Sequence, residues 1–462
     1  MNLDMASLFA ARERERYALH SRYLNDQLVR VAKTIGYDIG FVSGQGQYLF
    51  DRAGTRYLDL VGGWGAFALG RNHPAVRDAL LSVLGGDLPN LVQMDVSPLA
   101  GILAERLLRH APWLDKAFFA SSGSESVESA LKFARNATGR PGFVYCSDAF
   151  HGLTLGALSV NGDVAFRKGF GTLLAECVEV PFNDLAALER ALGTFRHAAF
   201  IVEPIQGKGV SVADTGYLRG AQELCRKFGT LLIADEIQTG LGRTGPFLAV
   251  EHDAVEPDMV LLSKGLSGGH VPVGAVLMRK WIFDRVFDRM DRAVVHGSTF
   301  SKNDLAMAAG LATLDVIVGE RLSHNAARQG RRLLAAFERM ARRYELIKEV
   351  RGRGLMIGLE FGPPHSRGLR ASWHALEAAT PGLFCQLITI PLLTEHHILS
   401  LVAGHGVHTV KIQPALTITD EDCDWIEQAF EAVIADAHRV PGAAWSLGKI
   451  LVDHAVRAHA TA

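Results

Sequence analysis

The stretch that decides the fold is residues 231–245, Leu-Leu-Ile-Ala-Asp-Glu-Ile-Gln-Thr-Gly-Leu-Gly-Arg-Thr-Gly. An apolar run, Leu231–Ala234, ends in the carboxylate of Asp235, and a glycine-rich segment follows. A short apolar run without alternation is typical of a strand buried on both faces of a sheet. Ligands of parallel α/β sheets bind outside the carboxyl ends of the strands. The stretch therefore predicts a buried sheet with a binding site at the edge where Asp235 lies.

Similar short apolar runs occur on both sides of this stretch. They are Ala117–Ala120, Phe143–Cys146, Phe200–Val202 and Met259–Leu262. Helical patterns such as Val127–Asn136 and Ala186–Leu192 separate them. Strands that alternate with helices indicate a mostly parallel sheet, flanked by helices and joined by right-handed crossovers. We therefore expect an α/β fold with a large central domain.

The two ends of the chain differ from this centre. Residues 1–35 have a helical pattern, and Phe41–Leu60 resembles a hairpin. A long helical pattern runs from residue 304 to Arg343, and a new unit then begins with a strand at Leu355–Phe361 and ends with a strand and helix at 410–435. We expect the ends to share one smaller α+β domain, with residues 1–60 as its N-terminal segment, 61–320 as the large domain and 321–462 as its C-terminal part.

The composition excludes several classes of protein. Of 462 residues, 48 are Lys or Arg and 49 are Asp or Glu, so the formal net charge of −1 provides no basic field for nucleic acid or an anionic membrane. Five cysteines lie far apart without a C-x-x-C pair, which favours a reducing, cytoplasmic compartment over a disulfide framework or zinc site. Charges from Arg12 onward argue against a secretory signal. The uncharged stretch Ala378–Thr394 contains two prolines and is interpreted as buried core, not a membrane span.

Chemically active side chains follow the predicted strands where each strand ends. They are Ser122-Gly-Ser-Glu125, Phe150 with His151, Glu203, Asp235 and Lys264. The carboxyl ends of parallel strands meet at one edge of the sheet, so we expect these side chains close together. A Gly/Ser turn, an aromatic ring, two carboxylates and a lysine are the parts that hold a phosphorylated, cationic aromatic aldehyde.

Two of these positions also have a structural interpretation. Ser122 with Glu125 resembles a capping box, and the glycine and serine between them would let backbone amides converge on a phosphate. An ordinary helix cap is the alternative. A shielded Asp235 carboxylate needs a positive partner, which is either a protonated pyridine nitrogen or an arginine such as Arg243.

Lys264 and its neighbours also have both a functional and a structural interpretation. Burial or a cationic neighbour would lower the pKa of Lys264 and make it a nucleophilic amine for a Schiff base, whereas a lysine whose head reaches solvent is the alternative. Phe150 and Ile237 could contact the two faces of an aromatic ring, and Gln238 could donate to a phenolic oxygen. As core residues, the same side chains would need no ligand.

Three motifs suggest other classes of site. Gly240–Gly245 matches the dinucleotide fingerprint, but no helix is expected after it and the next strand ends in a lysine. Ser267 lies in a G-x-S-x-G match, which would make a serine hydrolase only if a helix opened there. Four histidines are close in sequence, without the acidic or cysteine companions of a metal site, so no metal is expected. They are His396, His397, His405 and His408.

The motifs together resemble a known family. They are Ser122-Gly-Ser-Glu125, Phe150-His-Gly152, Glu203-Pro-Ile-Gln206, Asp235–Gly245, Ser263-Lys-Gly265 and His296-Gly-Ser-Thr-Phe300. Their order and spacing are similar to those of class III pyridoxal-phosphate aminotransferases of the ornithine, acetylornithine and putrescine type. The resemblance extends from Gly36 to Ala435.

The resemblance implies a fold-type-I homodimer with shared active sites and pyridoxal 5'-phosphate as cofactor. Lys264 would carry the cofactor as an internal aldimine and then move the proton, and Asp235 would pair with the pyridine nitrogen. The other implied cofactor contacts are Gly123 and Ser124 at the phosphate, Phe150 and Ile237 at the ring, Gln238 at the ring oxygen, and Ser298 and Thr299 at the phosphate of the neighbouring subunit. Glu203 would lie on the substrate side.

Three departures from the family pattern bear on the substrate. Ser301-Lys-Asn-Asp304 replaces a Gly-Asn-Pro segment, and Lys411 stands where relatives that act on α-amino acids carry an arginine. Trp64 places a large aromatic side chain in the expected substrate channel. We therefore expect a primary amine or ω-amino donor with an apolar part, and an oxo-acid acceptor such as pyruvate or 2-oxoglutarate, in ping-pong order. A same-fold aminomutase or decarboxylating enzyme is the alternative.

Overall fold

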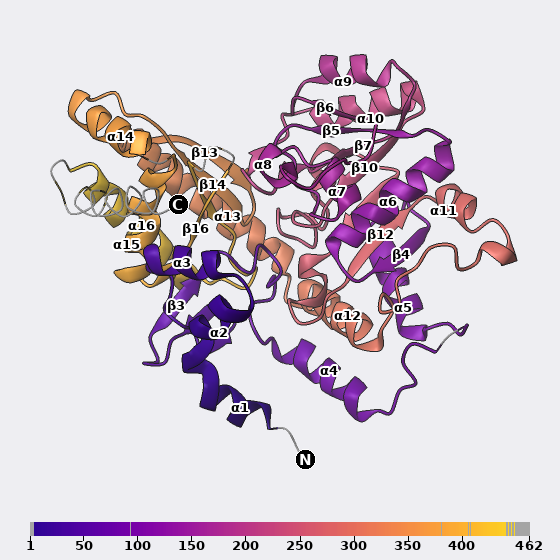
Figure 1. Ribbon diagram of the computed structural model, residues 1–462, viewed down its shortest axis with the longest axis horizontal. Coiled ribbons are helices and arrows are strands. Elements are labelled where there is room, and N and C mark those ends of the chain that lie inside the picture. Colours follow the sequence, from indigo (N-terminus) through magenta and orange to yellow (C-terminus); the bar gives the residue numbers. More distant parts are fainter. Residues whose placement is uncertain are drawn as a thin grey trace.

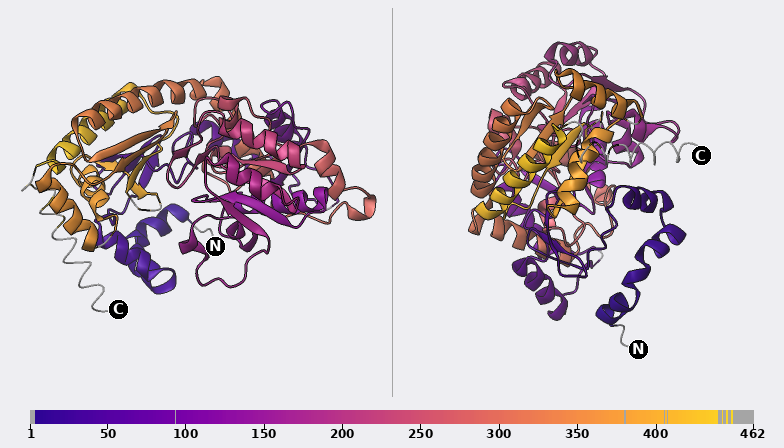
Figure 2. Two further views of the ribbon diagram at one scale, coloured as in Figure 1. Left: turned by 90° about the horizontal axis from the view of Figure 1, so that it is seen from above. Right: turned by 90° about the vertical axis from the view of Figure 1, so that its left-hand side faces the viewer.

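The computed structural model describes residues 4–439, apart from 93, 380, 405 and 407, together with residues 442, 445 and 448. The large half of the molecule, built around β4–β12, lies beside a smaller half that contains α13–α16 (Figures 1 and 2). One continuous core of buried side chains extends from the first half into the second. Residues 440–462 of the predicted C-terminal part of the small domain lie outside the described residues, apart from 442, 445 and 448. The exact domain boundaries stay a prediction.

The large half is organised around a seven-stranded sheet in the order β4-β12-β11-β10-β7-β5-β6. Its strands are β4 (Lys116–Ala120), β5 (Gly142–Cys146), β6 (Cys177–Val180), β7 (His197–Val202), β10 (Leu231–Asp235), β11 (Met259–Leu262) and β12 (Gly274–Met278). Five of them, from β11 to β6, are parallel, and β12 runs antiparallel to both neighbours. The predicted α/β fold with a mostly parallel sheet is therefore confirmed.

Two of these strands were not among the predicted runs. β6 lies at the sheet edge with exposed positions, so its sequence lacks the apolar signal of a central strand. β12 follows β11 after the short 3₁₀-helix at Lys264–Ser267, and this short connection returns the chain antiparallel.

Alternate residues of the central strands face two different cores. Ile233 and Leu261 belong to a core that also contains side chains of α6 and α11, whereas Leu232 and Leu262 belong to the larger core, which contains side chains of α9 and α10. Burial on both faces explains the unbroken apolar runs in the sequence. The helices of this half are α4 (Pro74–Gly85), α5 (Pro98–Leu108), α6 (Gly123–Thr138), α7 (Leu155–Ser159), α8 (Val164–Arg167), α9 (Leu185–Leu192), α10 (Tyr217–Phe228), α11 (Lys280–Val286) and α12 (Asp304–Gly319).

The smaller half joins the two ends of the chain. β3 (Arg56–Asp59) pairs in parallel with β15 (Ile398–Leu399), so one four-stranded sheet, β1-β2-β3-β15, contains both ends. A second sheet, β13-β14-β17-β16, is antiparallel. The remaining strands of these sheets are β1 (Ser43–Gln45), β2 (Tyr48–Phe50), β13 (Ile347–Arg353), β14 (Met356–Phe361), β16 (Leu401–Ala403) and β17 (Thr409–Ile412), and a separate pair is β8 (Ile205–Gln206) with β9 (Ser211–Val212).

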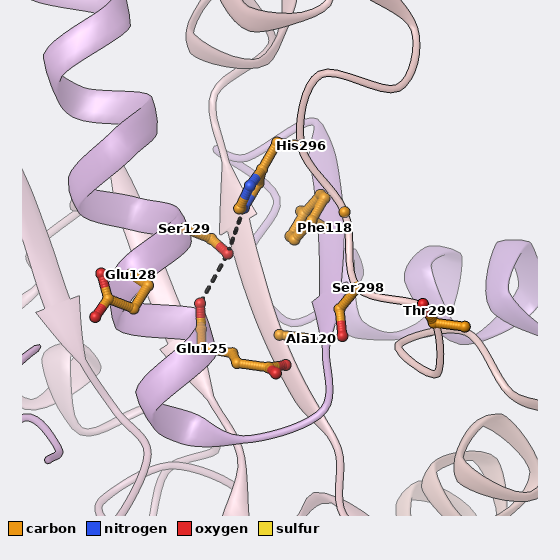
Figure 3. Close-up of a pocket in the computed structure, with 9 residues that line it drawn as sticks. Phe118, Ala120, Glu125, Glu128, Ser129, His296, Ser298 and Thr299 are labelled. Carbon is orange, nitrogen blue, oxygen red and sulfur yellow. Dashed lines mark hydrogen bonds between the residues drawn. The ribbon is translucent and has the colours of Figure 1, made fainter. Parts of the chain in front are cut away.

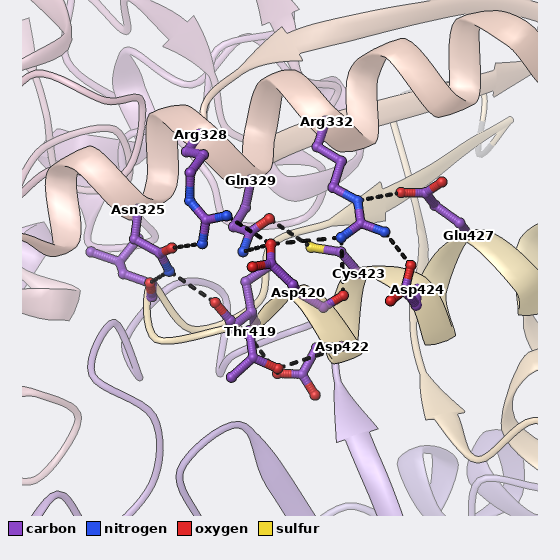
Figure 4. A network of polar contacts seen from close by, with 12 residues as sticks. Asn325, Arg328, Gln329, Arg332, Thr419, Asp420, Asp422, Cys423, Asp424 and Glu427 are labelled. Carbon is purple, nitrogen blue, oxygen red and sulfur yellow. Dashed lines mark hydrogen bonds and ion pairs between the residues drawn. The ribbon is translucent and has the colours of Figure 1, made fainter.

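The helices of the smaller half are α1 (Met5–Arg12), α2 (Arg16–Tyr23), α3 (Asp26–Thr34), α13 (Leu322–Arg343), α14 (Arg367–Ala379), α15 (Leu383–Thr394) and α16 (Asp420–Ala437). The single helical pattern predicted from residue 304 to Arg343 is two helices, because Arg321 takes a left-handed conformation with φ 54° between α12 and α13. α13 and α16 are tied by ion pairs of Arg332 with Asp424 and Glu427 (Figure 4).

In the part of the chain that the structure describes, no single helix is long and apolar enough to cross a membrane; α14 and α15 meet the length and composition test only as a pair bent by 98°. Most of α15 is buried. All five cysteines are free. No group of three or more His, Cys, Asp and Glu side chains among the described residues could hold a metal ion, and His405 lies outside them.

Candidate active site

A cavity of about 810 Å³ lies between the large and small halves, at the carboxyl ends of the central strands. It brings together ten of the predicted site residues. These are Trp64, Gly123, Ser124, Phe150, Glu203, Asp235, Ile237, Gln238, Lys264 and Lys411. The cavity therefore lies at the edge of the sheet where the predicted strands end.

The start of α6 forms one wall of this cavity. Ser122 caps the helix by accepting the Glu125 amide at 3.1 Å, while the Glu125 carboxylate accepts the Ser121 amide at 2.6 Å rather than the cap residue's own. The amides of Gly123 and Ser124 have no acceptor among the described residues. Because unpaired first-turn amides attract anions, this helix start offers a seat for a phosphate.

Asp235 is the buried carboxylate at the end of β10. One of its oxygens lies 2.7 Å from Nδ1 of His151, and the other accepts the Ile237 amide at 3.1 Å. Burial alone would lower the pKa of His151, but the hydrogen bond and charge of Asp235 outweigh it and raise that pKa. The alternative prediction, that Arg243 pairs with Asp235, is wrong, because the Arg243 guanidinium donates to the carbonyls of Leu355 and Pro414.

Lys264 lies directly after β11, where its backbone adopts a left-handed φ of 44° that is uncommon outside glycine. Burial lowers the pKa of its ammonium, and the charges of Asp235 and Glu203 oppose this shift. A strained backbone and a lowered amine pKa in one cavity are features of functional sites.

Glu203, Gly207 and Lys411 form a connected group at the back of the cavity. The Glu203 carboxylate accepts the amides of Phe150 at 2.9 Å and Gly207 at 2.7 Å. Burial raises the pKa of Glu203, and the charge of Asp235 adds to that rise. Lys411 donates to the Gly207 carbonyl at 2.6 Å, and burial, with the charge of Lys264, holds the pKa of Lys411 well below its usual range.

Gln238 is held at the boundary of the two halves. Its Nε2 donates to the Trp64 carbonyl at 2.9 Å and to Oε1 of Gln413 at 3.1 Å. The Trp64 side chain itself is 65% exposed at the open side of the cavity. Trp64 therefore contributes its carbonyl to the site and its indole to the entrance.

Several lining residues carry no predicted role. They include His151, Asp163, Phe166, Lys208 and Gln413. His151 belongs to the Phe150-His-Gly152 motif, and its position beside Phe150 is the signal that the sequence offers. Asp163, Phe166, Lys208 and Gln413 reach the cavity only through tertiary packing, which leaves no local pattern.

Ser298 and Thr299 do not lie in this cavity. They line a second one of about 370 Å³, together with Phe118, Glu125 and His296 (Figure 3). The Ser298 hydroxyl lies 3.2 Å from that of Ser121, beside the start of α6. Their expected contact with a neighbouring subunit stays a prediction.

The competing motifs form no site. Ser267 is buried in a 3₁₀-helix and its hydroxyl accepts the Val271 amide, so the helix that a nucleophile elbow would need does not open there. No helix opens within Gly240–Gly245, where Leu241 and Gly242 both have positive φ. Neither a serine hydrolase nor a dinucleotide site is favoured.

The cavity residues fit pyridoxal phosphate. The free amides at Gly123 and Ser124 suit its phosphate, the Asp235 carboxylate suits its protonated ring nitrogen, and the Lys264 amine suits its aldehyde. A side chain at Gly123 would approach Cδ1 of Ile237 to 3.2 Å, so the glycine keeps this wall open. Fold and site together define an aminotransferase of fold type I.

The comparisons with known proteins agree. The family model of class-III aminotransferases matches residues 33–434, and the chain therefore belongs to that family, whose members use pyridoxal phosphate. The aminotransferase PigE of Serratia sp. (strain ATCC 39006) is 36% identical over 447 residues, covering 90% of this chain. The chain spans 52% of the length of that relative.

Solved structures show the same architecture. The ornithine aminotransferase of Toxoplasma gondii superposes with a TM-score of 0.81 at 30% identity, over 94% of this chain and 99% of that one. An amine transaminase from an uncultivated Pseudomonas species, solved in its pyridoxal-phosphate-bound form, has a TM-score of 0.74 at 31% identity, over 86% and 94%. The predicted family, fold type and cofactor are thus confirmed, and the aminomutase and decarboxylase alternatives are not favoured.

Proposed function

We propose that the chain transfers the amino group of a primary amine or an ω-amino donor with an apolar part to an oxo acid, pyruvate or 2-oxoglutarate. One observation carries this proposal: the cavity has apolar walls, and no arginine is among its described lining residues. The apolar lining includes Leu60, Val61, Trp64, Phe166, Leu401 and Val402. Because arginine grips carboxylates with a planar fork, its absence favours a donor without an α-carboxylate.

The chain's own residues supply acid–base chemistry and orientation. Pyridoxal phosphate, when bound, supplies an aldehyde and an electron-accepting ring. Burial increases the neutral fraction of the Lys264 amine, which is the form that attacks a carbonyl and accepts a proton from a substrate carbon. His151 fixes the orientation of Asp235, and Ile237 and Phe150 line the cavity beside it.

The assembly proposed with this function is a homodimer. Large apolar side chains are exposed on Leu88–Val96 and on Met290–Phe300, and the amide of Asp304, four residues after the second region, donates to the Asn90 side chain in the first. Such a patch supports a protein partner, here a second copy. We also propose a cytoplasmic location, which the five free cysteines support. Light scattering of the purified protein tests the dimer.

Steady-state assays with a panel of amines test the donor. We expect primary amines and ω-amino compounds to change the absorption spectrum of the cofactor-loaded protein. They should turn over when pyruvate or 2-oxoglutarate is present. Reaction with α-amino acids only would contradict the proposal. A transaminase without an acceptor forms at most one equivalent of product per active site, so repeated turnover of the amine without an acceptor would instead indicate an aminomutase or a decarboxylating enzyme.

A further inference from the structure

An ion pair lies at the mouth of the cavity, away from the residues that carry the chemistry. The Lys208 ammonium pairs with the Asp163 carboxylate, both side chains are partly exposed, and both line the cavity. The same ammonium lies 4.9 Å from the centre of the Phe166 ring, whose edge contacts Phe150 at 5.5 Å between centres. The pair therefore borders both solvent and the aromatic wall.

The backbone on either side of this pair is held by other contacts. The second carboxylate oxygen of Asp163 accepts the Ala165 amide at 2.8 Å and caps α8. The Lys208 carbonyl accepts the Gly404 amide from the small half at 3.0 Å. Because these anchors do not use the ammonium, the flexible Lys208 stem can turn from Asp163 to another anion without moving the wall.

Besides Lys264, the lysines that line the cavity among the described residues are Lys208 and Lys411. Lys411 is buried on the Gly207 carbonyl, and the charge of Lys264 acts on it. Because Lys411 and Lys264 line the same cavity and interact, we assign the carboxylate next to the reacting carbon to Lys411. A second carboxylate, several bonds further along the substrate, would then have Lys208 as the remaining lysine of the cavity.

We propose that Lys208 determines acceptor specificity by exchanging Asp163 for the distal carboxylate of a dicarboxylic oxo acid. This inference rests on the proposed transamination and names its acceptor class. The exchange keeps the lysine ammonium paired, and the displaced Asp163 carboxylate is partly exposed to solvent and keeps its hydrogen bond from the Ala165 amide. The acceptor that fits is 2-oxoglutarate, and pyruvate lacks the group that Lys208 binds.

The test measures kcat/KM for each acceptor in the cofactor-loaded enzyme, because in ping-pong kinetics this ratio reports only the acceptor half-reaction. Lys208→Met should lower kcat/KM for 2-oxoglutarate by about tenfold or more, as expected for a lost charge-assisted hydrogen bond, and leave pyruvate unchanged. Lys208→Arg should restore most of the loss. Lys227→Met removes a lysine–glutamate pair that does not line the cavity, and serves as the control.

Asp163→Asn supplies the opposite perturbation. The asparagine can still cap α8 but no longer competes for the ammonium, so kcat/KM for 2-oxoglutarate should rise.

Equal loss for both acceptors in Lys208→Met, or loss for neither, overturns the inference. The donor half-reaction, followed by cofactor absorption without any acceptor, separates the two proposals: if no amine converts the cofactor, the proposed function fails, whereas normal conversion with unchanged acceptor selectivity rejects only the role of Lys208.

Discussion

Replacement of Gly207 by alanine tests how the back of the cavity is packed. A Cβ at this position would lie 1.9 Å from Oε1 of Gln238 and 3.0 Å from Oε2 of Glu203, so one of these side chains must move. Gln238 is the more easily displaced, because it is held by two side-chain hydrogen bonds, to Trp64 and Gln413, whereas Glu203 accepts two backbone amides.

The expected magnitude follows from those two bonds. Each is worth about 1 kcal/mol, and overpacking a buried site typically costs about 1–3 kcal/mol, so Gly207→Ala should lose about 2 kcal/mol of unfolding free energy. If Gln238 contacts the cofactor ring oxygen, its displacement should also weaken cofactor binding about tenfold. Urea unfolding and cofactor titration by absorbance measure the two effects.

A second substitution shows whether Gln238 is the group that moves. In a Gln238→Ala background the added methyl group has room, so Gly207→Ala should cost much less than in the wild-type chain. Gly101→Ala is the matched control, because a side chain at Gly101 in α5 meets nothing within 4 Å. Wild-type cofactor affinity in Gly207→Ala, or equal costs in both backgrounds, would refute this reasoning.

Three further predictions concern the site. Lys264→Ala should abolish the lysine-linked cofactor absorption and nearly all turnover, and full activity in this variant would reject the assignment. Because the pKa of His151 is raised in the fold, its protonated form stabilises the cofactor-free protein below the ordinary histidine value of about 6.5, and this stabilisation is lost as the pH rises through the raised pKa. The stability difference between wild type and His151→Gln, from urea unfolding at several pH values, should therefore shrink toward alkaline pH; a constant difference contradicts it. Trp64→Ala should change unfolding free energy by less than about 0.5 kcal/mol, because the indole is exposed, yet raise KM for bulky apolar amines and not for small ones, as steady-state assays would show.

The parts of the site that the sequence predicted are those with a local signal. Asp235 ends one strand and Lys264 comes two residues after another, and both strands are buried on both faces, so the end of each apolar run marks the edge of the sheet. Ser122 carries its cap signal within three residues. The location of these three residues at the site can therefore be predicted without knowing which strands pair with which.

The positions without a local signal depend on contacts between distant segments. Gln413, which was not predicted, accepts a hydrogen bond from Gln238 across 175 residues, and Lys411 donates to a carbonyl 204 residues away. The pairing of β3 with β15 brings the two chain ends together, and no pattern within either end encodes that partner. The resemblance to a family placed Lys411 in the site, but only the fold shows that its ammonium is already committed to Gly207.

The hydrogen bond between Lys411 and Gly207 bears on how one cavity could bind both the proposed amine donor and the oxo-acid acceptor. An amine donor with an apolar part needs contact with Trp64 and Phe166 and no cation, whereas an oxo acid needs a cation for each carboxylate. A permanently free arginine would satisfy the acid but would stay desolvated and unpaired beneath the amine. Lysines that already have partners, Lys411 on Gly207 and Lys208 on Asp163, avoid that cost, because each is satisfied while the donor is bound and available when the acid arrives. If the two proposals hold, these two lysine contacts would let one cavity bind both substrates without any rearrangement of the backbone.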